Sequence, residues 1–220
     1  MSLNIEQARF NMIEQQVRTW DVLDSAVLEV LKTVPREDFV PSRYRRLAFS
    51  DMRIPLAMQQ VMMKPVEEGR MLQSLDIRQG HSVLEIGTGS GFVTACLAAL
   101  GAQVMSIDLH SELADTAASR LDRLGFGTVS VECADLFAET FNPGRQFDRI
   151  VVTASAANIP KKLLDWVAPH GRLFCVRGHS PAMEAVCLHL DTPESWATKS
   201  LFETDLPRLI GAEDRPVFDF

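Results

Sequence analysis

The sequence has little that would mark a secreted, membrane or metal-dependent protein. Its four cysteines, Cys96, Cys133, Cys175 and Cys187, are widely spaced with no Cys-x-x-Cys pair, and its five histidines lack metal-ligand spacing. No stretch approaches membrane-spanning length, and the N-terminus lacks the basic start and apolar run of a signal peptide. We therefore expect reduced, mostly buried thiols, no metal, no membrane partner and a cytoplasmic location.

Positive charge is also scarce. The chain carries 22 Lys and Arg against 29 Asp and Glu, a formal net charge of -7, which argues against nucleic acid as a partner because phosphate binding needs a clustered positive field. The one basic run, residues 43–46, is expected to be solvated surface. There is no Gly-x-Ser-x-Gly elbow and no phosphate-loop Gly-Lys-Ser/Thr. The 220 residues, 46% of them hydrophobic, suffice for one sizeable core.

The most informative stretch runs from Ser82 to Gly91. A short apolar run predicts a strand that ends in three glycines at alternating positions, Gly87, Gly89 and Gly91. The apolar segment from Phe92 to Leu100 follows at once and predicts a helix. A strand, a glycine turn and a helix start together present backbone N–H groups and a positive dipole end to a ligand that approaches bare backbone.

The spacing of the glycines indicates which ligand. A dinucleotide fingerprint has Gly-x-Gly-x-x-Gly, but here the third glycine comes one residue early and Phe92 stands in its place. Glu85, at the strand end, would repel a pyrophosphate and attract an ammonium. Both departures favour the methionyl part of S-adenosylmethionine, with a nicotinamide cofactor as the alternative. Asp108 ends the next strand, about twenty residues after the first glycine, where a carboxylate reaches ribose hydroxyls in either case.

The unbroken Glu-x-Gly-x-Gly-x-Gly pattern from Glu85 to Gly91 resembles the class I S-adenosylmethionine-dependent methyltransferases. The resemblance implies an α/β fold with a doubly wound, mostly parallel seven-stranded sheet of Rossmann-like type. It also implies that Asp135 meets the adenine amino group, the alternative being a helix N-cap. The cofactor contacts then expected are Glu85 for the methionyl ammonium, Gly87, Thr88, Gly89, Ser90, Asp108 for ribose, Leu109, Asp135, Leu136 and Thr153.

Further segments resemble the protein-L-isoaspartate O-methyltransferases. These are Val34-Pro35-Arg36-Glu37, Phe39-Val40-Pro41, residues 48–56 and residues 147–154, and the resemblance covers roughly residues 12–178. It implies a cytosolic, monomeric repair enzyme that methylates the free carboxylate of an isoaspartyl residue. We expect one domain over residues 1–220, with an N-terminal helical cap and substrate loop over 1–80 and a cofactor-binding α/β core over 81–220.

One loop departs from this family. Where the family reads Gly-Gln-Thr-Ile-Ser-Gln-Pro, with a serine and nearby threonine that hydrogen-bond the substrate carboxylate, residues 59–65 read Gln-Gln-Val-Met-Met-Lys-Pro. The threonine is replaced by Val61 and the serine by Met63. Methyl transfer to an ionised carboxylate depends on positioning, so isoaspartyl activity should be weakened or absent. No catalytic residue is assigned; the candidates are Gln60, Lys64 and Asp51.

Two alternatives therefore stay open for the acceptor. The methionines around this loop can fill a core, or they can form an apolar pocket for a small apolar acceptor in place of a protein or peptide substrate. Lys64 can replace the lost donors or be a solvated residue at the start of the next helix. The chain can also be a family member that binds S-adenosylmethionine without isoaspartyl repair activity, acting on another acceptor or as a non-catalytic binding protein.

Overall fold

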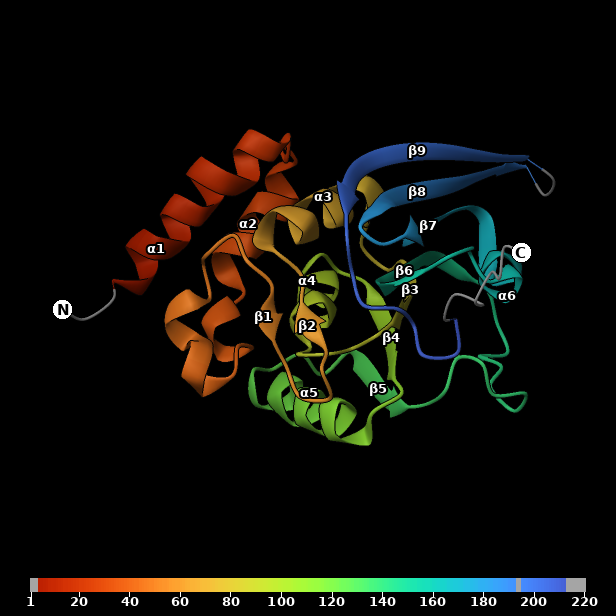
Figure 1. The fold of residues 1–220 in the computed structure, drawn as a ribbon, viewed down its shortest axis with the longest axis horizontal. Helices are drawn as coiled ribbons and strands as arrows, with labels where there is room; N and C mark the ends of the chain where they lie inside the picture. The colour runs from red at the N-terminus through yellow and green to blue at the C-terminus, as the bar shows by residue number, and fades with distance from the viewer. Residues whose placement is uncertain (1–3, 193–194, 213–220) are drawn as a thin grey trace, which may run out of the picture.

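The computed structural model describes residues 4–192 and 195–212, and a seven-stranded sheet lies at its centre (Figure 1). In spatial order its strands are β5 (Val129–Cys133), β4 (Gln103–Asp108), β3 (Ser82–Ile86), β6 (Phe147–Ala156), β7 (Val167–His179), β8 (Ala182–Thr192) and β9 (Ser195–Thr204). The first five are parallel to one another, and β8 and β9 are antiparallel additions. The predicted doubly wound, mostly parallel sheet is confirmed.

Both faces of the parallel strands are covered, which explains their nearly continuous apolar sequences. Because side chains alternate along a strand, Val83 and Val151 enter one core cluster while Leu84 and Ile150 enter the other. The first cluster lies beneath α3 (Pro65–Leu75), α4 (Phe92–Ala99) and α5 (Ser111–Arg123). The second receives Leu163 of the short helix α6 (Lys161–Asp165).

The register of the strands brings the expected site residues to one edge. Ile86 pairs with Ile107 on one side and with Val152 on the other, so Gly87, Asp108 and Thr153 all follow at the same level. Parallel strands share their carboxyl edge, and this edge is where ligands bind in open α/β sheets. Figure 1 shows β3, β4 and β6 adjacent at the centre of the fold.

The N-terminal helices form where the sequence places them. In α1 (Ile5–Asn11), Asn4 caps the helix by accepting from the Gln7 amide at 3.1 Å, and in α2 (Ser25–Thr33) the N-cap is Asp24. Between them the chain continues as a π-helical stretch, η1 (Met12–Val17), and a 3-10 turn, η2 (Arg18–Trp20). Two further 3-10 segments, η3 (Arg36–Asp38) and η4 (Ser42–Leu47), follow α2.

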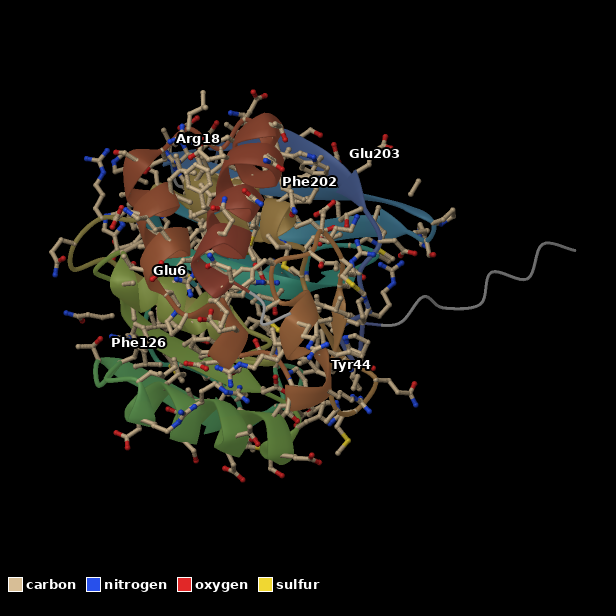
Figure 2. All side chains as sticks on the ribbon, turned by 90° about the vertical axis from the view of Figure 1, so that its left-hand side faces the viewer. Glu6, Arg18, Tyr44, Phe126, Phe202 and Glu203 are labelled. Carbon is tan, nitrogen blue, oxygen red and sulfur yellow. The ribbon has the colours of Figure 1, made fainter. Side chains whose placement is uncertain are left out.

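The cap shares its core with the sheet. Val17, Leu31 and Phe39 belong to the same cluster as Val83 and Phe92. At the far edge, Trp20 of η2 meets Phe202 of β9 edge-to-face at 5.9 Å, and Figure 2 shows Phe202 beside the helices of the cap. Helix α3, although it precedes residue 80, covers the sheet. The division at residue 80 is thus no break in the core, and the single domain stays a prediction.

The cysteines are free thiols and mostly buried, as expected. Cys96, Cys175 and Cys187 are buried, and burial raises the pKa of the Cys175 thiol to about 12. Cys133 is exposed at the end of β5, the edge strand. Among the described residues, no helix is long and apolar enough to cross a membrane, and no group of three or more acids, cysteines and histidines has metal-ligating geometry.

A small hairpin carries the divergent loop. Strands β1 (Ile54–Pro55) and β2 (Val61–Met62) pair antiparallel, and Met58 and Gln59 at their turn have φ of 53° and 59°. Two successive left-handed residues are the arrangement in which Asn-Gly is preferred, because a Cβ is disfavoured there. Both positions of this turn therefore carry a Cβ that makes their left-handed backbone conformation unfavourable.

Replacing Gln59 by glycine should relieve this strain. We expect Gln59→Gly to raise the free energy of unfolding by about 0.5–1 kcal/mol, since glycine adopts a positive φ without steric cost. Thermal or urea unfolding measures the change. Gln60→Gly, one residue on and outside the left-handed region, is the matched control and should destabilise; stabilisation by both variants, or by neither, would contradict the prediction.

Candidate functional site

The turn between β3 and α4 is shaped by its glycines. Gly87, Gly89 and Gly91 have φ of 97°, 54° and 84°, all left-handed. A Cβ on Gly87 would overlap the Thr153 hydroxyl, and one on Gly91 would lie 3.1 Å from the Cβ of Ala117 in α5. The Gly87 and Thr88 amides donate to the Ile107 carbonyl of β4 at 2.8 and 3.2 Å. The turn is therefore pinned to the neighbouring strand while its other side stays bare backbone.

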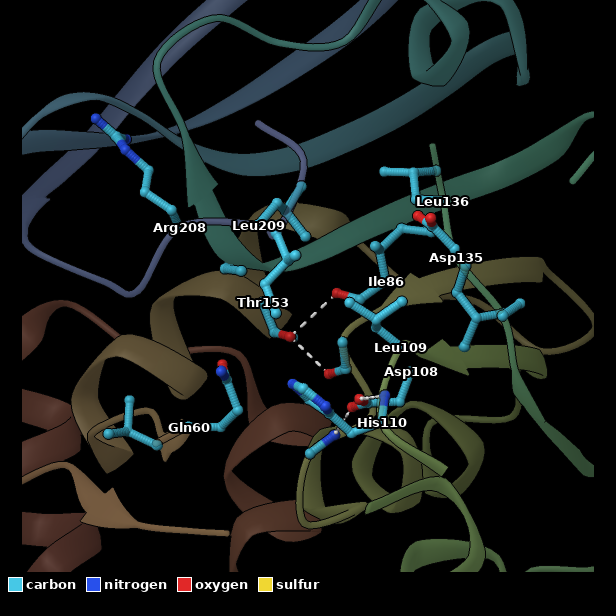
Figure 3. Close-up of a pocket in the computed structure, with 17 residues that line it drawn as sticks. Gln60, Ile86, Asp108, Leu109, His110, Asp135, Leu136, Thr153, Arg208 and Leu209 are labelled. Carbon is cyan, nitrogen blue, oxygen red and sulfur yellow. Dashed lines mark hydrogen bonds between the residues drawn. The ribbon is translucent and has the colours of Figure 1, made fainter. Parts of the chain in front are cut away.

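A cleft opens beside this turn, at the carboxyl ends of β3, β4 and β6 (Figure 3). It holds about 680 Å³ of space unoccupied by protein, including the part open to solvent. Seven of the ten residues expected to contact the cofactor line it: Gly87, Gly89, Asp108, Leu109, Asp135, Leu136 and Thr153. Residues from three strand ends and the loop after β5 thus meet in one cavity, as the strand register requires.

Asp108 is held in place from two sides. Its Oδ2 accepts from the Gly89 amide at 2.8 Å, and its Oδ1 accepts from the His110 amide at 2.9 Å. The side chain is only 7% exposed, so its orientation is fixed. A carboxylate offers about four acceptor positions, which leaves lone pairs for the hydroxyls of a ribose.

The walls for a flat base come from the loops after β4 and β5. Leu109 is 38% exposed at the cleft, and Leu136 is buried behind it. Asp135 is exposed and accepts from the Phe137 amide at 2.7 Å, which is a turn cap, since no helix follows it. One acceptor oxygen is thereby used, and Figure 3 shows the Asp135 side chain at the rim with Leu136. The adenine role of Asp135 stays a prediction.

Glu85 does not enter the cleft. Its side chain is fully buried, and its Oε2 accepts from the Thr94 hydroxyl of α4 at 2.5 Å and from the Ser106 hydroxyl of β4 at 2.7 Å. Burial raises the pKa of this carboxyl from 4.5 to about 7, although both hydroxyls act in the opposite direction. Glu85 therefore joins β3, β4 and α4 beneath the turn through Oε2, while its Oε1 is buried without a hydrogen-bond partner among the described residues. Its contact with a methionyl ammonium stays a prediction.

Thr153, Thr88 and Ser90 support the turn by hydrogen bonds. The Thr153 hydroxyl lies 2.6 Å from the Gly87 carbonyl and 3.1 Å from that of Ile86, and these contacts are drawn in Figure 3. The hydroxyls of Thr88 and Ser106 are 2.6 Å apart. Arg120 of α5 donates to the Ser90 carbonyl at 2.5 Å. These side chains fix the shape of the backbone that a ligand would meet.

A second, smaller cavity lies on the other side of the turn. It shares Val61, Gly87, Gly89 and Thr153 with the cleft. Its remaining lining residues are Met62, Met63, Glu68, Thr88, Ser90, Phe92 and Val93. The hairpin therefore brings the divergent loop directly against the glycine turn, and the side chain at the family's serine position, Met63, is a buried wall of this cavity.

The three catalytic candidates, Gln60, Lys64 and Asp51, and Met63 at the family's serine position are placed differently. Gln60 lines the cleft, and its side-chain amide donates to the Met58 carbonyl at 3.1 Å. Met63 lines the smaller cavity. Lys64 is the half-buried N-cap residue of α3, and Asp51 is exposed; neither lines either cavity. The structure thus brings Gln60 and Met63 to the turn, and it leaves Lys64 and Asp51 aside.

Two groups of site residues escaped the sequence analysis. Arg208, Leu209 and Ile210 line the cleft because the segment after β9 returns along β6, where the Leu209 amide donates to the Ser155 carbonyl at 2.8 Å. No periodic pattern marks this segment. Glu68 was also missed, because an acid in the first turn of a helix is usually explained by solvation and the helix dipole. Glu68 is buried because other segments, such as that of Arg36, pack over it, and the local sequence does not show this.

The order of the sheet, the glycine turn after β3 and the acid at the end of β4 define the class I methyltransferases. The family model for the protein-L-isoaspartate(D-aspartate) O-methyltransferases matches residues 7–186. The chain belongs to the protein-L-isoaspartate(D-aspartate) O-methyltransferase family.

Individual relatives cover most of the chain. A protein-L-isoaspartate O-methyltransferase of Koribacter versatilis is 37% identical over 178 residues, which is 81% of this chain and 79% of the relative. One from Magnetococcus marinus is 34% identical over 208 residues, 94% of this chain and 90% of the relative. A Plasmodium falciparum crystal structure described as such an enzyme, with S-adenosyl-L-homocysteine bound, superposes with a TM-score of 0.79 at 16% identity over 94% of this chain and 99% of that one. At this identity the last likeness shows the fold.

The buried Glu85 carboxyl should make stability depend on pH. A carboxyl whose pKa is raised on folding, here to about 7, contributes stability that is present below 4.5 and lost as the pH rises towards 7. Relative to Glu85→Gln, which cannot titrate, the wild type should lose up to about 3 kcal/mol of unfolding free energy over this window. Unfolding curves at pH 5, 6, 7 and 8 test this. As a control, Glu132→Gln changes an exposed acid of β5, and its unfolding free energy should depend on pH as that of the wild type does. The same pH dependence in Glu85→Gln and the wild type would contradict the prediction.

Proposed function

We propose that this chain is an S-adenosylmethionine-dependent O-methyltransferase whose cofactor occupies the cleft beside the glycine turn. One observation carries the proposal: the Asp108 carboxylate, fixed by the Gly89 and His110 amides, lies in the same cavity as the bare backbone of Gly87 and Gly89. Ribose hydroxyls would bind Asp108, and adenine would lie between Leu109 and Leu136 beside Asp135. The relative with bound S-adenosyl-L-homocysteine supports the choice of nucleoside.

The acceptor proposed from the relatives is the carboxylate of an isoaspartyl residue in a protein or peptide. In this reaction a carboxylate oxygen forms a bond to the methyl carbon as the bond from that carbon to sulfur breaks, which leaves S-adenosylhomocysteine. The nucleophile is already ionised near pH 7, so the protein needs to position the reactants and needs no strong base. Repair of damaged proteins in the cytoplasm is the proposed setting.

A second acceptor is favoured by the side chains of the divergent loop. Val61 and Met63 replace the two hydroxyls with which the family grips a carboxylate, and Met62 and Phe92 extend the apolar wall. A carboxylate beside Val61 and Met63 lacks these two donors, at a cost of about 1.5–3 kcal/mol for each charged hydrogen bond that is missing. A small apolar acceptor would fit these walls without that cost.

Binding of the nucleoside should be visible in thermal unfolding. S-adenosylhomocysteine at a hundred times its dissociation constant should add about 2.7 kcal/mol to the stability of the folded state. NAD at the same concentration is the matched control and should give no shift, because the third glycine of a dinucleotide fingerprint is missing. Protection by NAD alone would contradict the proposal.

The loop should limit isoaspartyl methylation. We expect little turnover of an isoaspartyl peptide by the native chain, and about a tenfold gain in kcat/KM for Met63→Ser, the value of one charged hydrogen bond. Transfer of labelled methyl groups to the peptide measures both. Met63→Ala opens the same space without a hydroxyl and should show no gain. Robust native turnover would mean that the lost hydroxyls do not matter.

A further inference from the structure

Glu68 is the one charged residue among those that line the smaller cavity. It extends from the first turn of α3, its side chain is 1% exposed, and it faces the cavity whose opposite side is the glycine turn 87–90. Glu85, predicted to hold a methionyl ammonium, lines neither cavity and accepts two hydroxyls instead.

Arg36, the ion-pair partner of Glu68, divides its donors among three acceptors. The Arg36 guanidinium donates to Glu68 Oε2, but it also donates to the Ala48 carbonyl at 2.7 Å and to the Met63 carbonyl at 2.9 Å. It stacks on the Phe92 ring at 4.6 Å. Despite this cation, burial raises the pKa of Glu68 from 4.5 to about 7, with a smaller contribution in the same direction from Glu67. A cation in the cavity would favour the ionised form of this buried carboxyl further.

The cleft and the smaller cavity share part of their lining, so one ligand can reach both. They meet at Gly87, Gly89 and Thr153, so a ligand whose ribose is held by Asp108 can pass the turn and extend into the smaller cavity. The tail of S-adenosylmethionine carries an ammonium and a carboxylate, and the cavity offers the first a carboxylate partner. The second can approach the N-terminus of α4.

We infer that Glu68 of α3 binds the α-ammonium of the methionyl tail of the cofactor, in the place expected for Glu85. The inference rests on the proposed function, because it presumes the nucleoside in the cleft. It assigns to Glu68 a binding contact on the tail alone, which separates it from residues that hold the nucleoside.

Two ligands that differ only in the tail test this. S-adenosylhomocysteine carries the amino acid, and 5′-methylthioadenosine has a methyl group in its place. Glu68→Gln should weaken S-adenosylhomocysteine about tenfold to a hundredfold, the effect of one charge-assisted hydrogen bond, and change 5′-methylthioadenosine less than about twofold. Calorimetric titration at pH 8 gives the ratio of the two affinities. If Glu68→Gln leaves the ratio of the two affinities as it is in the wild type, for instance by weakening both ligands equally, the inference is overturned.

Two isosteric variants are matched controls. Glu67→Gln changes the next acid of the same helix turn, whose carboxylate accepts from Arg53 at 2.8 Å and Thr204 at 2.6 Å and lines neither cavity. It should leave the ratio unchanged. Glu85→Gln distinguishes the two buried acids: a ratio that falls in Glu85→Gln and stays constant in Glu68→Gln returns the ammonium to Glu85 and overturns the inference.

The wild type gives a second readout in case Glu68→Gln does not fold. The groups facing Glu68 are Arg36 from η3, Glu67 on its own helix and the Cys96 thiol of α4, whose pKa is raised partly by Glu68. Since the ammonium prefers the ionised carboxylate, the affinity ratio of the two ligands should rise between pH 6 and pH 8. An affinity ratio that stays constant between pH 6 and pH 8 overturns the inference. Failure of the wild type to bind either ligand overturns the proposed function, and only then does the inference fall with it.

Discussion

A single buried guanidinium joins the parts of this molecule that must meet at the glycine turn. Arg36 comes from the segment after the N-terminal helices, and its donors reach the Ala48 carbonyl, the Met63 carbonyl and the Glu68 carboxylate, while its plane lies on Phe92 of α4. Arg36 thereby connects the N-terminal cap, the divergent loop, α3 and α4. Breaking a buried charge pair by removing one partner costs about 3–5 kcal/mol, so this network holds the loop in place as well as the fold.

The charge network also determines the character of the space around the turn. On the side of the cleft, an acid is fixed by backbone amides and the walls are leucines, which suits a nucleoside. On the other side, one carboxylate lies in a cavity lined by methionines, Phe92 and the hydroxyl-bearing side chains of the turn. An anionic acceptor meets no donor side chain from Val61 or Met63 there, whereas a cation meets Glu68. The departures in the loop and the burial of Glu68 therefore act in the same direction, because both make this cavity more favourable for a cationic group than for an anionic one.

Membership of the family and divergence at its substrate loop are compatible because they involve different layers of the structure. The sheet and the glycine turn are backbone features, fixed by strand register and by glycines at positive φ, and the register also places Asp108 at the end of β4. The acceptor side is formed by a two-stranded hairpin whose side chains can change without disturbing the sheet. A chain that shares 34–37% of its sequence with its relatives can therefore keep the family's sheet and turn whatever side chains this loop carries.

By itself, the sequence determined the features that depend on local order along the chain. The apolar runs, the glycines at 87, 89 and 91 and the acid at Asp108 predicted a strand, a turn, a helix and one edge of a parallel sheet, because each follows from backbone preference and period. Tertiary packing decided which acids line a cavity. Glu85 lies under the turn and Glu68 lines a cavity, and the segment of Arg208 returns to the cleft. The reason is physical: burial of a charge depends on the partners that other segments bring to it, such as Thr94 and Ser106 for Glu85 and Arg36 for Glu68, and no local pattern records them.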